Sequence, residues 1–434
     1  SILLCNSWNH WHDSLVLVKI LSRSDFPATR QIFVKDLISG VTVAIVALPL
    51  AIGFGITAGM SAAAGISTAI IAGFIAGLFG GSRFQVSGPT GAMTVVLIPV
   101  INKFGIAAIP TLGLMAGLIV IAMSLIRLGS LINKVPNCVV EGFTVGIAIV
   151  ISLQQLPFAF GVIKGEGDRT LVVAIHTVQK AVAIGVHWQT LLVVFITLAI
   201  KFNIVKIVES FKIRMYFPAS FSALLLTTLI VKAFDFNVAT IGNIPRNVST
   251  YTSPILSSGE YLSLITPALS IAVLVAIESL LSARVADDIS NVPSDKKFQP
   301  NQELFGQGLA TTLASVFGGM PATGAIARTN VNVRSGASTR LASMIHSVVL
   351  LVIVIFLAPI FSQIPSAAIA GVLIGTSFRI FNKASMLEIF KSSKSNIFIY
   401  IATAVVTVSV DLIWGIGFGI ALYLLINLVK KSNS

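Results

Sequence analysis

Charged residues are scarce in this sequence. Asp, Glu, Lys and Arg make up 10% of its 434 residues, whereas hydrophobic residues make up 55% and the mean hydropathy is +0.95. Soluble domains carry roughly a quarter of their residues as charged side chains. Apolar runs near the length of a bilayer crossing recur from Val41 to Val429. The composition therefore excludes a soluble globular protein and predicts an all-α polytopic membrane protein within the lipid bilayer.

Cysteine, histidine and enzyme motifs are also scarce. Cys5 and Cys138 stand far apart in the sequence, and the five histidines show no metal-ligand spacing. GxSxG, Walker A, HExxH and paired-carboxylate patterns are all absent. We therefore expect no disulfide framework, no metal, no cofactor and no enzymatic activity. A membrane-embedded enzyme is the less favoured alternative, because it would need a nucleophile–base pair or a metal cluster within the membrane.

Acidic residues are outnumbered by basic ones, 16 to 29, which gives a formal net charge of +13. Such a charge would attract nucleic acid. However, the basic residues lie in short loops between the apolar runs, and membrane topology explains that arrangement better. We therefore expect no nucleic-acid partner.

Glycine and proline are unevenly placed, and they mark a motif that occurs twice. The copies are Phe79-Gly80-Gly81 with Thr90-Gly91-Ala92, and Phe317-Gly318-Gly319 with Thr323-Gly324-Ala325. A third landmark, Pro-x5-Gly-x3-Gly, begins at Pro136 and again at Pro365. The three pairs lie 238, 233 and 229 residues apart. This nearly constant offset predicts two repeats, although chance matches in a Gly-rich chain are the alternative.

Each repeat is predicted to hold seven membrane segments, fourteen in all. The expected spans are about 37–59, 61–80, 88–101, 111–127, 137–156, 188–202 and 216–233, then 263–283, 303–318, 324 onward, 341–360, 366–378, 395–410 and 412–429. Segments 3 and 10 begin at the Gly/Pro clusters, so we expect two interrupted half-helices that face each other. Matching interrupted segments in two halves point to a transporter binding site.

The distribution of basic residues predicts the orientation. Because each half has an odd number of segments, the two halves are inverted relative to each other in the membrane. With the N-terminus inside, most basic residues fall in inner loops. The outer loops then hold six, namely Lys103, Lys164, Arg169, Lys180, Lys232 and Arg246. Inner-loop enrichment of Lys and Arg is the usual pattern in membrane proteins. We expect both termini to be cytosolic in a plasma (inner) membrane.

The starts of segments 3 and 10 predict an anion site. The first backbone N–H groups of a helix lack intrahelical partners, and with the helix dipole they favour negative charge. Gly91 and Gly324 allow a substrate to approach the backbone, and Thr90 and Thr323 add hydroxyl donors. Arg328, one turn into segment 10, is an intramembrane cation and therefore a functional candidate. A structural ion pair is the alternative for Arg328.

Glu278 is the candidate coupling residue. It lies deep in segment 8, where a charged carboxylate is costly, and this predicts proton uptake. Ser282 lies one turn later on the same face and is a supporting residue. The alternative for Glu278 is a fixed salt bridge to Arg328. Phe54 is expected to form an apolar wall of the pocket, and His346 to be a satisfied packing residue.

Four stretches resemble one known family. They are DLISGVTVAIVALPLAIGFG at 36–55, FQVSGPTGAMTVV at 84–96, AIESLLSARVADD at 276–288 and GGMPATGAIARTNVNVRSGA at 318–337. Together they resemble the sulfate permease (SulP) family of anion transporters over roughly 36–430, and the last stretch is highly specific. Most family members continue into a cytosolic STAS domain, whereas this sequence stops at residue 434.

The resemblance implies a division of the chain. Residues 1–35 would form an N-terminal cytosolic segment, 36–130 and 260–362 a core domain, and 131–259 and 363–434 a gate domain. It also implies a substrate site between segments 3 and 10, lined by segments 1 and 8. Carried onto this chain, the site residues are Phe54, Thr90, Gly91, Ala92, Glu278, Ala327 and Arg328, to which the duplicated motif adds Thr323 and Ala325.

The resemblance also implies a mechanism. Sodium-driven bicarbonate carriers of the family tend to have Asp at the position of Glu278 and no Arg at that of Arg328, so this chain favours protons over sodium. We therefore expect a proton-coupled symporter of small anions, of the sulfate, bicarbonate or dicarboxylate class, that acts as a homodimer through elevator-like core-versus-gate movement. An uncoupled exchanger or channel on the same fold is the alternative.

Overall fold

The computed structural model describes residues 26–432 apart from 133–134, 168, 211–218, 243–250, 254–259, 291, 294–296, 382 and 411. The first 25 residues, with Cys5, His10 and His12, therefore lie outside the described part. Several loop charges used to predict the orientation, such as Arg246, also lie outside it.

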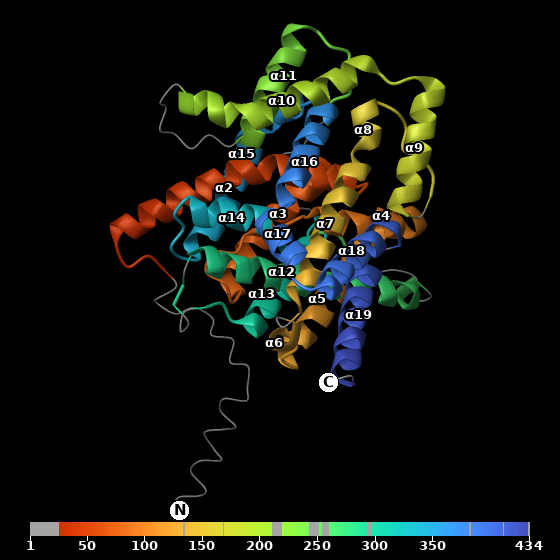
Figure 1. The fold of residues 1–434 in the computed structure, drawn as a ribbon. Helices are drawn as coiled ribbons and strands as arrows, with labels where there is room; N and C mark the ends of the chain where they lie inside the picture. The colour runs from red at the N-terminus through yellow and green to blue at the C-terminus, as the bar shows by residue number, and fades with distance from the viewer. Residues whose placement is uncertain are drawn as a thin grey trace, which may run out of the picture.

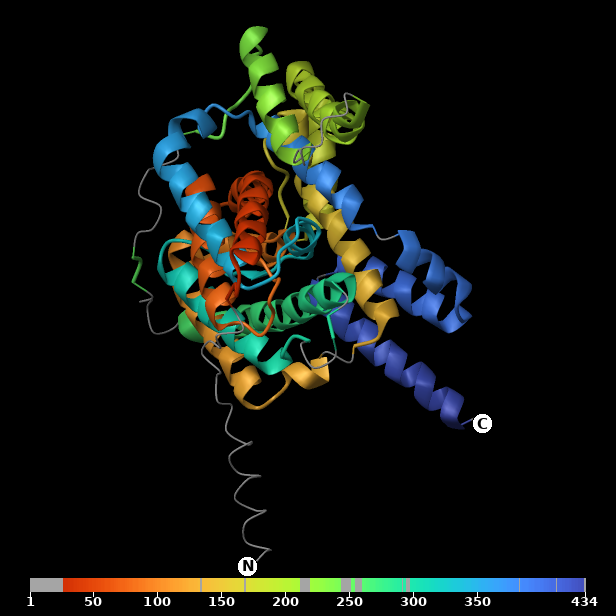
Figure 2. The same cartoon turned by 90° about the vertical axis from the view of Figure 1, so that its left-hand side faces the viewer.

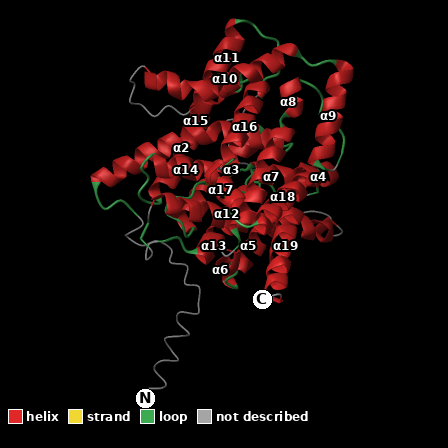
Figure 3. Ribbon diagram, in the orientation of Figure 1, coloured by secondary structure: helices red, strands yellow, loops and turns green. Residues whose placement is uncertain are grey.

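Helices make up most of the described chain (Figure 3). The first half contains α2 (Arg30–Thr57), α3 (Ala62–Phe79), α4 (Gly91–Phe104), the short 3-10 helix η2 (Ile106–Ala108), α5 (Ile109–Leu125), α6 (Gly129–Ile132), α7 (Asn137–Gln154), α8 (Leu156–Phe160), α9 (Thr170–Ile184), α10 (Trp188–Ser210) and α11 (Ala219–Ala233). The second half contains α12 (Glu260–Ser290), α13 (Pro300–Val316), α14 (Ile326–Arg334), α15 (Leu341–Phe361), α16 (Ser366–Ile380), α17 (Lys383–Lys391), α18 (Lys394–Ser409) and α19 (Leu412–Ser432). Two strands, β1 (Ser87–Gly88) and β2 (Thr323–Gly324), join the halves.

Seven helices in the described residues are long and apolar enough to cross a membrane, and shorter apolar helices accompany them. Most of the predicted spans correspond to these helices, but segments 9 and 10 correspond to α13 and α14, which are not among them. Helix α9 lies where we expected a polar loop. Its apolar run has 15 residues and is interrupted by His176 and Lys180, so it is shorter than a bilayer crossing. Small residues at helical spacing, Ala174, Thr177 and Ala181, form its buried face.

The repeated Pro-Gly-Gly landmark has a packing role. Pro136 and Pro365 immediately precede α7 and α16, where a missing N–H costs a helix nothing. The glycines that follow let a second helix approach: a Cβ on Gly142 would lie 2.4 Å from a backbone oxygen of α18, and one on Gly371 would lie 2.8 Å from Thr197 of α10. Thus α18 packs on α7 as α10 packs on α16, and the sequence repeat is also a repeat of contacts.

The helices form two groups (Figures 1 and 2). The first helix group contains α2, α3, α4, α5, α12, α13, α14 and α15, in which α13 packs on α5 and α3, and α15 packs on α2 and α3. The second helix group contains α7, α10, α11, α16, α18 and α19, and Figure 2 shows it as a slanting arm beside the first. The groups meet where α16 packs on α2 and α7 packs on α4.

Candidate functional site

The two copies of the Thr-Gly-Ala motif meet in space. Strands β1 and β2 pair antiparallel, with Ser87 opposite Gly324 and Gly88 opposite Thr323. Helices α4 and α14 begin directly after this pairing and are only 14 and 9 residues long. The Thr90 side chain caps α4, whereas Ala325 begins α14 without a side-chain cap. The N-termini of α4 and α14 therefore lie together beside Thr90 and Thr323, at a place we call the crossing. The first N–H groups of both helices and the positive ends of their dipoles meet there.

A single carboxylate joins both motif copies. Glu278 of α12 accepts hydrogen bonds at Oε2 from Thr323 at 2.7 Å and from Thr90 at 3.0 Å. The two threonine hydroxyls are 3.4 Å apart. Glu278 itself is partly buried. The arrangement places an ionisable group at the centre of the crossing.

Arg328 lies beside this crossing but forms no ion pair with Glu278 within 4.0 Å in the described structure. Its side chain is 1% exposed, and Nη2 donates to the Pro89 carbonyl at 2.5 Å. Nη1 is buried with no hydrogen-bond partner in the described chain. A Cβ on Gly88 would lie 2.3 Å from Nη1, so only glycine fits there. The salt bridge between Arg328 and Glu278, which was the alternative for both residues, is thus absent from the described structure, and one guanidinium nitrogen has no hydrogen-bond partner there.

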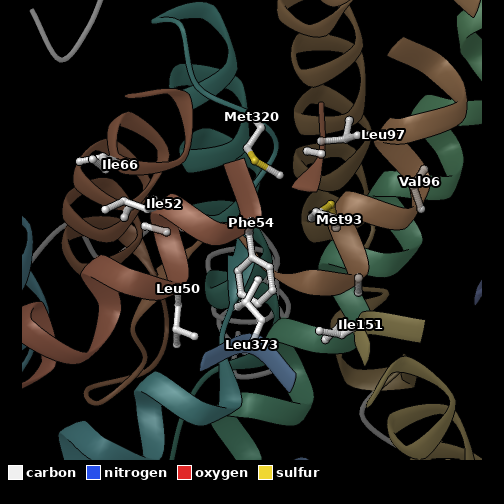
Figure 4. Packing of buried hydrophobic residues seen from close by; sticks show 14 of the residues in the cluster. Leu50, Ile52, Phe54, Ile66, Met93, Val96, Leu97, Ile151, Met320 and Leu373 are labelled. Carbon is white, nitrogen blue, oxygen red and sulfur yellow. The ribbon is translucent and has the colours of Figure 1, made fainter. Parts of the chain in front are cut away.

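Phe54 and the residues around it form an apolar surface next to the start of α4. The Phe54 ring is 8% exposed and lies beside Leu373 in Figure 4, with Met93 and Ile151 nearby. A Cβ on Gly91 would lie 2.2 Å from the Ile151 Cδ1 atom and 3.2 Å from the Phe54 ring. The second helix group thus covers the start of α4 through Ile151. Any side chain larger than hydrogen at position 91 would collide with that cover.

The remaining predicted residues surround α14 and α4. Ala92 and Ala325 are buried and Ala327 is half-buried. Ser282 does not bond to Glu278; instead its hydroxyl donates to Thr329 at 3.1 Å. Thr329 also accepts from the Val86 N–H at 3.1 Å. The Thr329 hydroxyl therefore ties α14 to α12 through Ser282 and to the residue before β1 through Val86.

Glu303 is a buried carboxylate that the sequence did not single out. Glu303 of α13 is 1% exposed and accepts from the N–H groups of Gly81 and Ser82, at 2.7 and 2.8 Å. In the other repeat Thr68 accepts from the Met320 N–H at 2.8 Å. Thr68 and Glu303 therefore play corresponding parts, since each accepts hydrogen bonds from the loop that follows the other helix.

The expectation for His346 was wrong. This side chain is fully buried on α15, but neither ring nitrogen has a hydrogen-bond partner in the described chain. The ring faces α3 at Gly73, where a Cβ would lie 3.2 Å from Nδ1. His346 therefore packs against α3 at Gly73.

The chemistry available at the crossing is limited to a few groups. They are two hydroxyls, one carboxylate, one guanidinium and two helix N-termini. Within the described ranges, no three His, Cys, Asp or Glu side chains are placed to hold a metal ion. Such a set can bind a small anion and a proton in the same place.

Comparison with known proteins gives consistent matches. The model of the Sulfate permease family matches residues 33–403. The "Putative sulfate transporter YvdB" of Bacillus subtilis (strain 168) is 34% identical over 397 residues, which covers 90% of this chain and 73% of that protein. The transmembrane domain of the cyanobacterial bicarbonate transporter BicA has a TM-score of 0.78 at 31% identity, covering 89% of this chain and 98% of that one. The structure of SLC26A9 has a TM-score of 0.81 at 16% identity, covering 98% and 69%, and supports a common fold.

Proposed function

The chain belongs to the sulfate permease family, and we propose that it is a secondary active transporter that moves small anions together with protons. Membership confirms the resemblance seen in the sequence, the polytopic helical fold and the absence of an enzymatic role. The chain is thus an integral membrane anion transporter. The single observation that carries the finer proposal is the Glu278 carboxylate, bonded to both motif threonines next to an unpaired donor of Arg328.

The anion binds between the starts of α4 and α14. The free Nη1 of Arg328, the helix N-termini and the hydroxyls of Thr90 and Thr323 supply donors for it, and Phe54 walls the pocket. Sulfate and bicarbonate are the first candidates, because relatives are named as transporters of these ions. A small dicarboxylate is the remaining class with suitable charge.

Glu278 carries the coupled proton. A charged carboxylate repels an incoming anion strongly at low dielectric, and protonation removes that repulsion. The two threonine hydroxyls suit both states, because a hydroxyl can donate to a carboxylate and accept from a carboxylic acid. Proton and anion should therefore bind together, each raising the affinity for the other.

Transport proceeds by an elevator-like movement between the two helix groups. The first group, with 36–130 and 260–362, acts as the core, and the second, with 131–259 and 363–434, acts as the gate. Two hydrogen bonds cross the boundary: Gln154, the last residue of α7, accepts from Thr94, and Gln155 next to it donates to Thr57. Such neutral bonds are weak enough to break and reform during a cycle. In this proposal the chain is a homodimer in the plasma (inner) membrane with both termini cytosolic.

The alternative is an uncoupled anion exchanger or channel on the same fold. It is favoured by the position of Arg328, whose bond to Pro89 places it next to Thr90 and its partner Glu278, because a nearby cation stabilises a charged carboxylate. The choice depends on whether Glu278 takes up a proton when the anion binds.

Uptake into proteoliposomes tests the proposal. Radiolabelled sulfate and bicarbonate are offered separately, under an inward proton gradient, an inward sodium gradient or no gradient. We expect accumulation of one or both anions above equilibrium with the proton gradient only. Equilibration without accumulation under every gradient would instead establish the exchanger or channel.

A further inference from the structure

A cavity of about 540 Å³ lies between the two helix groups. The first group lines it with the second half of α4 and the first part of α12, and the second group lines it with α8 and the ends of α7 and α18. Gly59, Pro99 and Lys164 line the cavity and are exposed, so it opens at the surface of the chain. An exposed ammonium at this opening indicates water rather than lipid. The cavity has room for on the order of ten water molecules.

One face of α4 runs from this opening to the crossing. Pro99, Val95 and Gly91 are each four residues apart, so they lie on the same face of the helix. Pro99 is exposed and Val95 is half-buried, and both line the cavity, whereas Gly91 is buried beyond its lining. Thr90, which bonds to Glu278, immediately precedes Gly91. Exposure along this face therefore falls from the cavity toward the crossing and ends at Gly91.

Ile151 of α7 closes this face. A Cβ on Gly91 would lie 2.2 Å from the Ile151 Cδ1 atom, so the isoleucine rests directly on the start of α4. The neighbouring Val150 lines the cavity. Gln154, one turn after Ile151, also lines it and accepts a hydrogen bond from Thr94 at 2.8 Å. One layer of side chains, made by Ile151 and the bond between Gln154 and Thr94, thus lies between the cavity and the crossing.

We propose that this cavity is the path by which the anion reaches the crossing, and that Ile151 is the barrier that moves aside to admit it. The inference rests on the proposed transport function. Val95, Val150 and Gln154 make the inner end of the cavity neutral, so it holds an anion weakly and releases it to the donors at the crossing, as a conducting path requires. Ile151 belongs to the second helix group and Gly91 to the first, so movement between the groups separates the two residues.

Cysteine labelling tests the path without relying on transport. Single cysteines are introduced into the purified full chain in nanodiscs, with Cys5 and Cys138 replaced by Ser, and a small anionic methanethiosulfonate is added. Val95→Cys should react readily, whereas Thr90→Cys, beyond the barrier, should react at least about 10-fold more slowly. Adding Ile151→Ala should speed the reaction at Thr90→Cys by about 10-fold, because the packing that keeps the barrier closed is lost.

The same labelling supplies its own controls. Ile151→Ala should leave the rate at Val95→Cys unchanged, because that residue lies on the cavity side of the barrier. Ile151→Val, which keeps most of the packing, should speed the reaction at Thr90→Cys less than Ile151→Ala does, and it serves as the second variant if the alanine variant does not fold. Equal rates at Thr90→Cys with and without these changes, or no reaction at Val95→Cys, would overturn the proposal.

Transport gives a second test, with each variant compared before and after labelling. An adduct at Val95→Cys obstructs the path and should lower the initial uptake of radiolabelled sulfate or bicarbonate by about 10-fold, while equilibrium affinity stays unchanged because the adduct lies outside the crossing. Asn102→Cys is the matched control, since Asn102 is an exposed residue of α4 that does not line the cavity, and its adduct should leave uptake unchanged. Undiminished uptake after complete labelling of Val95→Cys would contradict the path and leave the Arg328 site standing. Absence of uptake by the unlabelled wild type would contradict the proposed function instead, and the labelling rates would still decide the path.

Discussion

The two halves of the molecule share their backbone plan but differ in charge. Helix α14 carries Arg328, whereas the residue of α4 at the same repeat offset is Val95. The loop after α3 is held by Glu303, and the equivalent loop after α13 by Thr68. The two repeats therefore form a symmetric backbone framework. The charged residues that give this framework its chemistry lie in the second repeat.

The second helix group shows the same asymmetry. Lys201 of α10 packs on Gly375 as Thr407 of α18 packs on Gly146. Lys201 is fully buried, and its Nζ donates to the Val372 carbonyl at 2.5 Å and to the Thr376 hydroxyl at 2.6 Å. A neutral threonine serves at the equivalent position, so the packing does not require the charge.

The largest effect is expected at Arg328. Arg328→Gln makes this position of α14 as neutral as Val95 of α4, and anion affinity should fall by at least about 30-fold, because a buried charged donor is removed. The measurement is equilibrium binding of radiolabelled sulfate and bicarbonate to the folded variant. Arg334→Gln, an exposed arginine on the same helix, is the control and should bind normally. Wild-type affinity of the site in the Arg328 variant would reassign Arg328 to a structural role.

Glu278→Gln should separate binding from coupling. The amide imitates the protonated acid, so the variant should bind and exchange anion but lose accumulation driven by a proton gradient. In the wild type, initial uptake should rise as external pH falls, because protonated Glu278 no longer repels the anion; in the variant this pH dependence should disappear. Accumulation as steep as that of the wild type would exclude Glu278 as the coupling residue.

Glu303 should affect stability rather than transport specificity. Glu303→Gln weakens two hydrogen bonds from backbone N–H groups to a charged acceptor, at a cost of about 2 kcal/mol in free energy of unfolding. Thr68→Val removes the neutral counterpart and should cost about 1 kcal/mol. Thermal unfolding in nanodiscs compares the two. A larger loss from Thr68→Val would show that the asymmetry of the two loops does not affect stability as argued.

The smallest effect is expected at Lys201. Lys201→Met keeps the apolar stem that packs on Gly375 and removes a buried charge, so stability should change by about 1 kcal/mol or less. The Thr376 hydroxyl still donates to the Val372 carbonyl at 2.7 Å. Thr407→Val in the other repeat is the matched control. A variant that fails to fold would show that the charge itself holds α10 to α16.

Local sequence predicted much of this arrangement, because repeats and interrupted helices are recognisable from short motifs of Gly and Pro. The Gly/Pro clusters predicted two short helices, and the structure places their starts side by side through β1 and β2. The Pro-Gly-Gly landmark predicted equivalent helices that turn out to pack equivalently. The division into core and gate, the orientation and the dimer remain predictions.

Features that depend on contacts between residues far apart in the chain could not be predicted from the sequence. No residue close to Glu303 in sequence indicates that its hydrogen-bond partners are backbone N–H groups more than 200 residues away. The same holds for Gln154, whose bond to Thr94 links the two helix groups. Helix α9 was not predicted, because its apolar run is too short for a membrane segment and its buried face has only small residues.

The most direct test of the central claim is proton uptake on anion binding. Purified protein in weakly buffered solution is mixed with sulfate or bicarbonate near neutral pH, and a pH indicator reports the protons bound, after correction for the anion's own buffering. We predict about one proton taken up per anion bound at the Arg328 site by the wild type, and none by Glu278→Gln. Anion binding without proton uptake by the wild type, or equal uptake by both proteins, would contradict the claim that proton and anion share this site.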